Sequence, residues 1–403
     1  MECDRPKRDW LKATSAPTLL CDDVTKLNEP SIYNYMDDTQ TVIPPRLVCY
    51  TFGYSCKDLS TLNNSSSSWK DSCLTDGKGS TGKTWRGNMD MVKQTRPLWL
   101  LMENVVAARK GKNFERLNED LTNEGYLCMD VELNAQESGL PQDRQRAYFS
   151  AIDMGIASSS TDPFQFSALV DEMKLPDCLP LERFLLPRGH PYLEKIMESR
   201  QQAAEKKMQR VVMKRPASGK LKKRSGKKWV RDHWHVRRTL DMLAPAAMCP
   251  PHLEQIAHQN DMSSREADIM RIMFDQQSGA VTSHGGQPCR ELKHSAPRVV
   301  KMLKKQSKGQ ASRGRRRSGA TSCLLPASRL LLLPPYVEAP RFMTGLEALS
   351  IQGIERIHMQ MYNGKDSLYM SLAGNAFSGG SYALMFLATL ASVTLTAEIL
   401  QDL

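Results

Sequence analysis

Five short apolar runs alternate with helix-like stretches over the first 160 residues, and this rhythm restricts the possible fold more than any other feature. Short, largely apolar runs suit strands that are buried on both faces of a parallel sheet. The clearest helix-like stretch, residues 113–123, is followed by Gly125, and a glycine often ends a helix. Repeated strand–helix–strand units predict an α/β fold with a doubly wound, mostly parallel sheet. The runs expected as strands are residues 18–21, 46–52, 98–102, 127–133 and 147–152.

Three short motifs lie next to the expected strands. They are TFGYSCKDLS around Cys56, LWLLMENVV around Glu103, and GLPQDRQRAYF, which contains Gln142, Arg144 and Arg146. Doubly wound sheets bind ligands outside the carboxyl ends of their strands, so we expect Cys56 and Glu103 to face one crevice. The alternation of side chains along a strand places Arg144 and Arg146 on the same side.

Together the three motifs supply a thiol, a carboxyl group and two guanidinium groups. A thiolate can add to a pyrimidine ring, a carboxyl group can protonate the ring edge, and a guanidinium can stabilise charge on the ring carbonyl. Each residue also has an ordinary structural explanation: a buried inert thiol for Cys56, a helix cap for Glu103, and surface ion pairs for the arginines. Their joint presence in this order favours covalent chemistry on a pyrimidine.

The positive charge of the chain is concentrated in one block. Residues 201–320 contain 27 Lys and Arg against 9 Asp and Glu, a net charge of +18, while the whole chain carries +11. Such a block predicts a polyanionic partner, and a solvated basic linker is the alternative. Helices are expected at residues 191–214 and 252–274. Mobile loops or linkers are expected at the basic tracts 214–238 and 301–317, which are poor in apolar residues.

Ten cysteines are scattered without a CxxC pair, which indicates free thiols in a reducing compartment and argues against a disulfide framework or a metal site. One apolar run, residues 382–400, has about the length of a membrane span. It contains several Ser and Thr residues and Glu398, and it lacks a basic flank, so a buried terminal helix is the favoured interpretation. We therefore expect a soluble protein without a membrane segment.

The order and spacing of the three motifs resemble those of the DNA cytosine-5 methyltransferase family. The GYSCKDLS segment is similar to the family's Pro-Cys-Gln segment, the ENV triplet at Glu103 matches its carboxylate motif, and QDRQR matches its Gln-x-Arg-x-Arg motif. The resemblance implies that Cys56 is the nucleophile and that Glu103, Arg144 and Arg146 act on the target base. It also implies a fold of the S-adenosylmethionine-dependent methyltransferase type.

Four further segments resemble family motifs. MECDRPKRDWL is similar to the segment whose acidic residue binds the cofactor ribose, here Glu2. LLCDDVTKL is similar to the segment whose aspartate meets the adenine amino group, here Asp23. PRFMTGLEALSIQGI resembles the Arg-x-x-Thr-x-x-Glu segment, and SLAGNAFSGG resembles the last motif, with Asn375 at the cofactor pocket. The cofactor that this implies is S-adenosyl-L-methionine, and the implied substrate is DNA.

The resemblance covers residues 1–155 and 325–395 and divides the chain into three parts. Residues 1–160 are expected to form the catalytic α/β domain. Residues 161–325 are expected to form a basic, partly disordered insert that serves as the target-recognition region and contacts DNA. Residues 326–403 are expected to return to the catalytic domain. In a eukaryote such an enzyme is expected in the nucleus.

Two departures from the family pattern shape these expectations. The glycine-rich motif that cradles the methionine end of the cofactor is absent, so we expect an N-terminally truncated domain with an exposed sheet edge and weak cofactor binding. Ser55 and Lys57 replace the usual Pro and Gln beside the nucleophile. The alternatives are a catalytically inactive DNA-binding remnant and a tRNA cytosine-5 methyltransferase.

Overall fold

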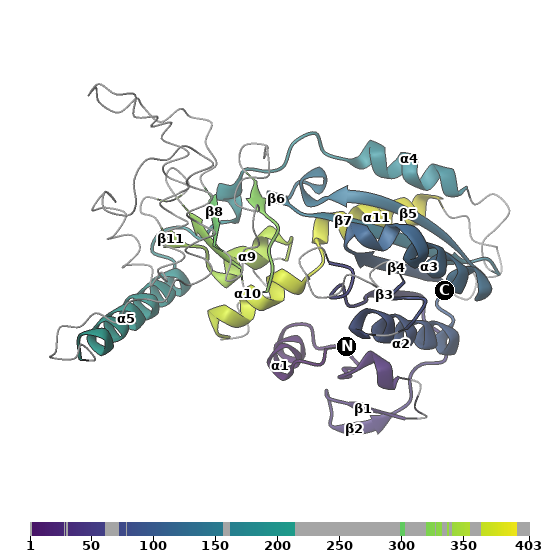
Figure 1. The fold of residues 1–403 in the computed structure, drawn as a ribbon, viewed down its shortest axis with the longest axis horizontal. Coiled ribbons are helices and arrows are strands. Elements are labelled where there is room, and N and C mark those ends of the chain that lie inside the picture. Colours follow the sequence, from purple (N-terminus) through teal and green to yellow (C-terminus); the bar gives the residue numbers. More distant parts are fainter. Residues whose placement is uncertain are drawn as a thin grey trace. The chain divides into compact units, whose positions relative to one another are not determined.

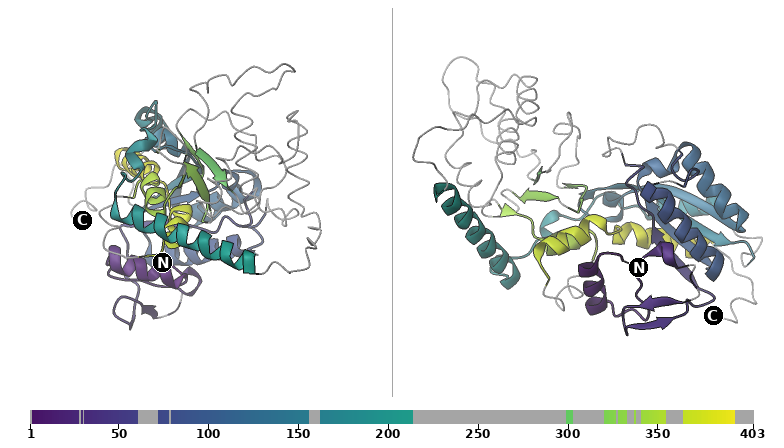
Figure 2. Two further views of the ribbon diagram at one scale, coloured as in Figure 1. Left: turned by 90° about the vertical axis from the view of Figure 1, so that its left-hand side faces the viewer. Right: turned by 60° about the horizontal axis from the view of Figure 1, so that its bottom comes forward.

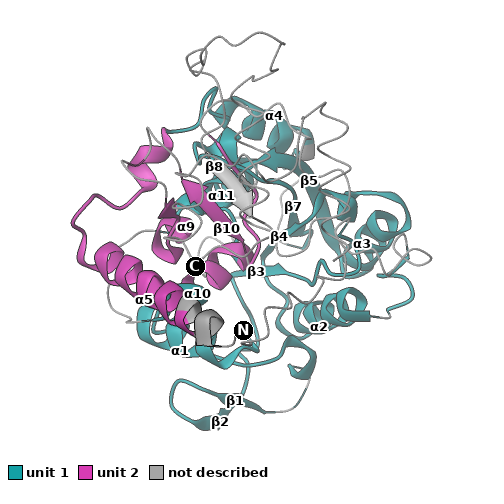
Figure 3. Cartoon of the chain, turned by 60° about the vertical axis from the view of Figure 1, so that its left-hand side comes forward, with its two compact units in different colours: residues 1–179, 351–368, 376–403 teal, residues 180–350, 369–375 magenta. Residues whose placement is uncertain are grey.

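The chain forms two compact units (Figure 3). The first comprises residues 1–179, 351–368 and 376–403, and the second comprises residues 180–350 and 369–375. The computed structural model describes residues 2–27, 29, 31–60, 72–77, 79–155, 162–213, 299–302, 320–326, 328–332, 337, 341–354 and 364–392.

A four-stranded sheet forms the centre of the first unit, with the strand order β3-β4-β7-β5. β3 (Cys49–Gly53) pairs with β4 (Trp99–Asn104) in parallel, and Gly53 lies opposite Glu103. β7 (Gln145–Asp153) pairs antiparallel with both β4 and β5 (Tyr126–Asn134). β3, which precedes Cys56, and β4, which contains Glu103, are therefore neighbouring strands.

The sheet is mixed, whereas the sequence predicted a mostly parallel one, and the reason lies in one connection. Only residues 135–144 link β5 to β7, and they form the short helix η3 (Ala135–Ser138) and the two-residue strand β6 (Gln142–Asp143). A parallel pair needs a crossover of about a dozen residues or more, so a link of this length returns the chain in the antiparallel direction. The predicted α/β class itself is confirmed.

Helices cover both faces of this sheet, as a doubly wound fold requires (Figure 1). On one face α2 (Gly79–Thr95) and α3 (Gly111–Asn123) pack on the strands, and on the other face α4 (Pro163–Met173) and α11 (Gly379–Ser392) do so. The first core cluster contains Trp85, Met89, Leu117 and Leu121 from the helices, and the second contains Phe166, Val170, Met385 and Ala388.

Strand β7 shows why both faces of the sheet are apolar. Ala147, Phe149 and Ala151 belong to the core under α2 and α3. Tyr148 and Ile152 belong to the core under α4 and α11. Successive side chains of a strand point to opposite faces, so a strand covered on both faces has a nearly continuous apolar run. In β7 this run is interrupted by Ser150, whose hydroxyl lies 2.8 Å from that of Thr389 on α11.

Four of the five strands expected from the sequence are confirmed, and the fifth is wrong. Residues 18–21 form no strand, although Leu20 and Cys21 are buried. The backbone N–H of Leu20 donates to the side chain of Asn34, and the carbonyl of Cys21 accepts from the N–H of Glu2. These backbone groups therefore bond to a side chain and to an irregular segment rather than to a neighbouring strand.

The N-terminal elements lie beside one another (Figure 2). They are α1 (Arg5–Thr14), the short helix η1 (Val24–Lys26), and the antiparallel hairpin of β1 (Ile32–Asn34) and β2 (Thr39–Thr41). The guanidinium of Arg8 lies 4.4 Å from the ring centre of Tyr35, and Lys12 donates to the carbonyl of Tyr35. These contacts attach α1 to the segment that follows β1.

The second unit contains an antiparallel sheet with the order β11-β10-β8. Its strands are β8 (Val299–Met302), β10 (Arg329–Leu332) and β11 (Arg341–Phe342). The expected helix at residues 191–214 is confirmed as α5 (Pro191–Met213). The expected helix at 252–274, the basic tract 214–238 and most of the tract 301–317 lie outside the described residues.

A buried ion pair orders the C-terminal part of the second unit. Arg341 donates from Nη2 to Glu347 Oε1 at 2.6 Å and from Nη1 to Oε2 at 2.9 Å. Glu347 lies in α9 (Gly345–Ile351) and also accepts from the N–H groups of Leu186 and Thr344. A buried carboxylate needs such partners, so the Arg-x-x-Thr-x-x-Glu segment supports the fold of this unit.

The expected terminal helix is confirmed in its first part, α11, and residues 393–403 lie outside the described residues. Among the described helices, none is long and apolar enough to cross a membrane.

Candidate active site

Cys56 follows β3 and lies at the start of a tight turn. The N–H groups of Leu59 and Ser60 both donate to the carbonyl of Cys56, at 3.2 Å and 2.9 Å. The residue is exposed, while Asp58 and Leu59 on the same turn are buried and hold the loop against the protein. A fixed turn with an exposed cysteine is the geometry that a nucleophile requires.

Glu103 lies on β4 near the position where the strand ends, and it is only 8% exposed. Its Oε1 atom is 3.1 Å from Nε of Arg146 and 3.5 Å from Nη2 of Arg144. Arg146 lies on β7, and Arg144 lies just before that strand. The antiparallel pairing of β4 with β7 therefore brings the second and third motifs together.

Electrostatic contacts connect Cys56 to the same group of side chains. Although the residue as a whole is exposed, protein atoms around the sulfur desolvate the Cys56 thiol and raise its pKa above the ordinary value of 9.0, and the nearby carboxylate of Glu103 raises it further. Arg146, the backbone at Cys56 and Arg144 lower it, in that order. The backbone of the loop therefore favours the thiolate, but desolvation and Glu103 have the larger effect.

The predicted catalytic residues therefore lie together in the first unit, where strands β3 and β4 end and β7 begins. We call Cys56, Glu103, Arg144 and Arg146 the thiol–carboxylate cluster. In chemical terms the cluster combines a nucleophile, a hydrogen-bonding carboxyl group and two permanent cations.

Sequence reasoning assigned no role to Asn104, the second residue of the ENV triplet. Its amide donates to the carbonyl of Tyr54 at 2.9 Å, and its side-chain oxygen accepts from the N–H of Val105 at 2.8 Å. Asn104 is almost completely buried. It links the end of β4 to the loop that carries Cys56. The signal for this link in the sequence is an asparagine at the last position of a largely apolar strand, β4.

The last motif, SLAGNAFSGG, reaches the same end of these strands through Ala376 and Phe377. Arg144 Nη2 donates to the carbonyl of Ala376 at 3.0 Å. A Cβ atom on Gly53 would lie 2.9 Å from the ring of Phe377, so a glycine is needed there unless the ring moves. Gln142 accepts a hydrogen bond from Gln352 at 3.4 Å. Residues separated by more than 200 positions thus meet at the strand ends.

Two of the three predicted cofactor residues also lie near each other. The N–H of Glu2 donates to the carbonyl of Cys21, two residues before Asp23. Glu2 Oε1 accepts from the N–H of Asp4, and Asp23 Oδ1 accepts from the N–H and the hydroxyl of Thr25. In the described part of the chain, the second oxygen of each carboxylate has no hydrogen-bond partner. Such acceptors fit the hydroxyl and amino donors of an adenosine.

Asn375 is exposed at the end of α10 (Asp366–Asn375), in the second unit. Within the described ranges, no group of three or more His, Cys, Asp or Glu residues is placed to hold a metal ion.

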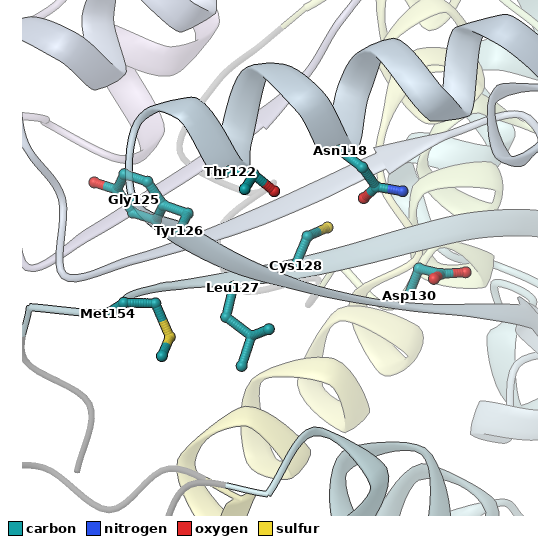
Figure 4. Close-up of a pocket in the computed structure, with 8 residues that line it drawn as sticks. All are labelled: Asn118, Thr122, Gly125, Tyr126, Leu127, Cys128, Asp130 and Met154. Atoms are coloured by element: carbon teal, nitrogen blue, oxygen red, sulfur yellow. The ribbon is translucent and has the colours of Figure 1, made fainter. Parts of the chain in front are cut away.

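One cavity of about 390 Å³ lies between α3 and the outer strand β5 (Figure 4). Asn118 and Thr122 project from α3, and Cys128 and Asp130 line the strand side. Burial raises the pKa of the Cys128 thiol, so this thiol is a poor nucleophile. None of the thiol–carboxylate cluster lines this cavity.

An α/β sheet with helices on both faces, and with a cysteine, a glutamate and two arginines grouped at its edge, is the arrangement expected of a methyltransferase that acts on a base. The model of the family described as C-5 cytosine-specific DNA methylase matches residues 48–378, and the chain belongs to this family. The membership predicted from the motifs is confirmed.

Three methyltransferases are similar to parts of the chain. The DNA (cytosine-5-)-methyltransferase DMT5 of Cryptococcus neoformans is 28% identical over 194 residues, which are 47% of this chain and 7% of that protein. The type II methyltransferase M.NmeDI of Neisseria meningitidis is 30% identical over 105 residues, which are 25% of this chain and 24% of that protein. The type II methyltransferase M.MthTI of Methanothermobacter thermautotrophicus is 33% identical over 118 residues, which are 28% of this chain and 33% of that protein. The chain thus matches a third or less of the length of these relatives.

Solved structures with similarity to the chain include the Dnmt2 methyltransferase of S. pombe, with a TM-score of 0.45 and 12% identity over 96% of this chain and 88% of that one. The methyltransferase EhMeth of Entamoeba histolytica has a TM-score of 0.47 and 9% identity, with the same coverage of 96% and 88%.

Proposed function

We propose that this protein transfers a methyl group from S-adenosyl-L-methionine to carbon 5 of cytosine in DNA, with Cys56 as the nucleophile. The observation that carries the proposal is the thiol–carboxylate cluster, in which Glu103 lies within 3.5 Å of both arginines. The loop that carries Cys56 starts beside Glu103, since Gly53 pairs with Glu103 and the amide of Asn104 donates to the carbonyl of Tyr54.

Cys56 supplies the covalent step. Carbon 5 of cytosine is a weak nucleophile, and addition of a thiolate to carbon 6 moves an electron pair onto carbon 5. Carbon 5 then takes the methyl group. Loss of the proton on carbon 5 and departure of the thiolate restore the aromatic ring and the free cysteine. Each turnover thus consumes no thiol.

Glu103 and the arginines support the addition. A carboxyl group at ring nitrogen 3 stabilises the negative charge that the thiolate brings into the ring. We assign Arg146 to the ring carbonyl, and Arg144, which also bonds to Ala376, to holding Glu103 in position.

The adenosine end of the cofactor is assigned to Glu2 and Asp23, whose free carboxylate oxygens are the support for this assignment. Asn375, in the second unit, is assigned to cofactor binding on the strength of its motif alone. When bound, the cofactor supplies an activated methyl group on a positively charged sulfur.

The target base must leave the helix stack to reach a site of this kind. Residues 161–325 are assigned to target recognition, and their net positive charge suits the phosphate backbone. A DNA substrate would place the protein in the nucleus of a eukaryote. An inactive DNA-binding protein is the second candidate, since it needs only the basic residues and none of the cluster.

Mechanism-based trapping tests the proposal. A duplex with 5-fluorocytosine should form a covalent adduct with the full chain when S-adenosylmethionine is present, because fluorine cannot leave as a proton does. Cys56→Ser should abolish the adduct. Cys73→Ser is the matched control, because Cys73 is buried and has no place in the proposed site.

Three results would count against this proposal. An adduct that persists in Cys56→Ser removes Cys56 from the mechanism. No methyl transfer to any duplex, combined with intact DNA binding, supports the inactive protein. Transfer to tRNA with none to DNA assigns the same chemistry to the other polymer.

A further inference from the structure

The loop that carries Cys56 is attached to the first turns of α2 by a set of hydrogen bonds. The N–H of Ser55 donates to Oγ1 of Thr84 at 2.9 Å, and the hydroxyl of Ser80 donates to Oγ of Ser55 at 2.9 Å. The N–H of Lys57 also donates to Oγ of Ser55, at 3.4 Å. Ser55 therefore connects the residues on both sides of the thiol to the helix.

A proline could make none of these three contacts. Proline has no N–H and no hydroxyl, and it restricts the backbone through its ring instead. The family segment that GYSCKDLS resembles has a proline where this chain has Ser55. The structure thus shows hydrogen bonds at the position where a ring would otherwise fix φ.

A second attachment lies one turn further along the loop. Asp58 Oδ2 accepts from the N–H of Thr81 at 2.8 Å, and the N–H of Asp58 donates to Oγ1 of Thr81 at 3.2 Å. Asp58 and Thr81 are both buried. This reciprocal pair satisfies donors in the first turn of α2 and gives the Cys56 loop a rigid support.

We propose that Thr84 and Ser80 are positioning residues for the Cys56 thiol, and that they act through Ser55 in place of a proline ring. This inference rests on the proposed role of Cys56. A thiol that must approach carbon 6 at bonding distance depends on the position of its loop, and an error of about 1 Å can cost about 10²-fold in turnover.

A double-mutant cycle on the full chain tests this coupling. Thr84→Val keeps the shape of the side chain and removes the acceptor for the Ser55 N–H, and Ser55→Pro restores the ring. Thr84→Val alone should lower kcat by about tenfold or more, with little change in the Kd for duplex DNA. In the Ser55→Pro background, the same substitution should change kcat by less than about twofold. Thr84→Ser, which keeps the hydroxyl, should behave like the unmodified protein.

The chain offers a matched control on the same helix. Thr95 is buried in α2, and its hydroxyl donates to the carbonyl of Met91 just as that of Thr84 donates to the carbonyl of Ser80. Thr95→Val removes the same kind of helix contact without touching Ser55 and should leave kcat unchanged.

A second experiment separates this inference from the proposed function. Cys56 is alkylated with iodoacetamide over a range of pH, and the rate is measured on the peptide that contains Cys56. The rate profile should change in Thr84→Val and not in Thr84→Ser, whether or not the protein methylates DNA. Equal effects of Thr84→Val in the unmodified chain and in the Ser55→Pro background would overturn the positioning role. So would equal damage from Thr84→Val and Thr84→Ser. Ser80→Ala provides a second variant if Thr84→Val does not fold.

Discussion

The carboxylate of Glu103 lies 3.1 Å from Nε of Arg146, although the two residues are 43 positions apart in the sequence. The contact exists because β4 and β7 pair antiparallel, with Glu103 opposite Tyr148 and Asn104 opposite Ala147. Both side chains are mostly buried, with 10% and 14% of their area exposed. A charge pair with so little solvent around it has a strong influence on neighbouring groups.

Glu103→Gln should lower turnover far more than DNA affinity. A hydrogen bond to the ring strengthens as negative charge builds there, so its loss affects the transition state, and general acid–base groups contribute about 10²–10⁴-fold. We expect kcat to fall by about 10²-fold, while the Kd for duplex DNA, which depends mostly on phosphate contacts, changes little. Steady-state kinetics with titrated duplex measures both. Glu115→Gln, at an exposed position on α3, is the control, and lost DNA binding with an unchanged kcat would refute the role.

The reactivity of Cys56 should depend on pH in a way that the cluster explains. The pKa of its thiol is raised above 9.0, so alkylation should be slow at neutral pH and should increase through pH 9 as thiolate forms. Glu103→Gln removes a negative charge that raises the pKa, so the profile should shift to lower pH, with a higher rate at pH 7.5.

Arg146→Met should shift the Cys56 profile in the opposite direction, because Arg146 lowers the pKa of the thiol. Labelling of Cys56 is followed by mass spectrometry of its peptide, with Glu115→Gln again as the control. Equal profiles for the Glu103 and Arg146 variants would show that burial alone sets the pKa of this thiol.

Asn104→Leu should destabilise the first unit. It leaves the carbonyl of Tyr54 and the N–H of Val105 without their present partners, and an unsatisfied buried group costs about 1–3 kcal/mol. We expect the free energy of unfolding to fall by about 2 kcal/mol or more, measured by urea denaturation. Asn123→Leu, at an exposed helix end, should change it by less than about 0.5 kcal/mol. Equal stabilities for the two variants would remove Asn104 as a structural link.

Asp23→Asn should weaken cofactor binding and leave the local fold intact. The asparagine oxygen can still accept from the N–H of Thr25, but the side chain loses its charge and presents a donor to the adenine amino group. The Kd for S-adenosylmethionine, already expected to be weak, should increase by about tenfold or more in calorimetry. Asp22→Asn is the matched neighbour and should leave the Kd unchanged. An unchanged Kd in Asp23→Asn would place the adenosine elsewhere.

DNA binding should fall steeply with salt, because each phosphate contact releases a counterion. Replacing Lys222, Lys223 and Arg224 with Gln should reduce the slope of log K against log salt concentration by about 3. Replacing the exposed Lys83, Lys110 and Lys112 removes the same charge from the first unit and should have little effect. Affinity is followed by fluorescence anisotropy from low to moderate salt. A slope that is the same in both triple variants would remove residues 201–320 from the proposed DNA contact.

The sequence by itself determined the elements and the chemical groups of the site. Buried strands and amphipathic helices leave local patterns, so four strands, α3 and α5 could be predicted within a few residues. The order of Cys56, Glu103 and the arginine pair was also sufficient to identify the family, since covalent chemistry on a pyrimidine needs those groups.

Only the tertiary structure decided how these elements pair and what surrounds the thiol. The direction of β7 depends on the length of the link from β5, and the apolar run at residues 18–21 fails to form a strand because its backbone bonds to Asn34 and Glu2. The sign of the Cys56 pKa shift depends on burial and on Glu103, which lies 47 residues away in sequence. The hydrogen bond that Thr84 accepts from the Cys56 loop and the one that Asn104 donates to it leave no periodic signal in the sequence, because each joins two segments whose proximity is created by folding.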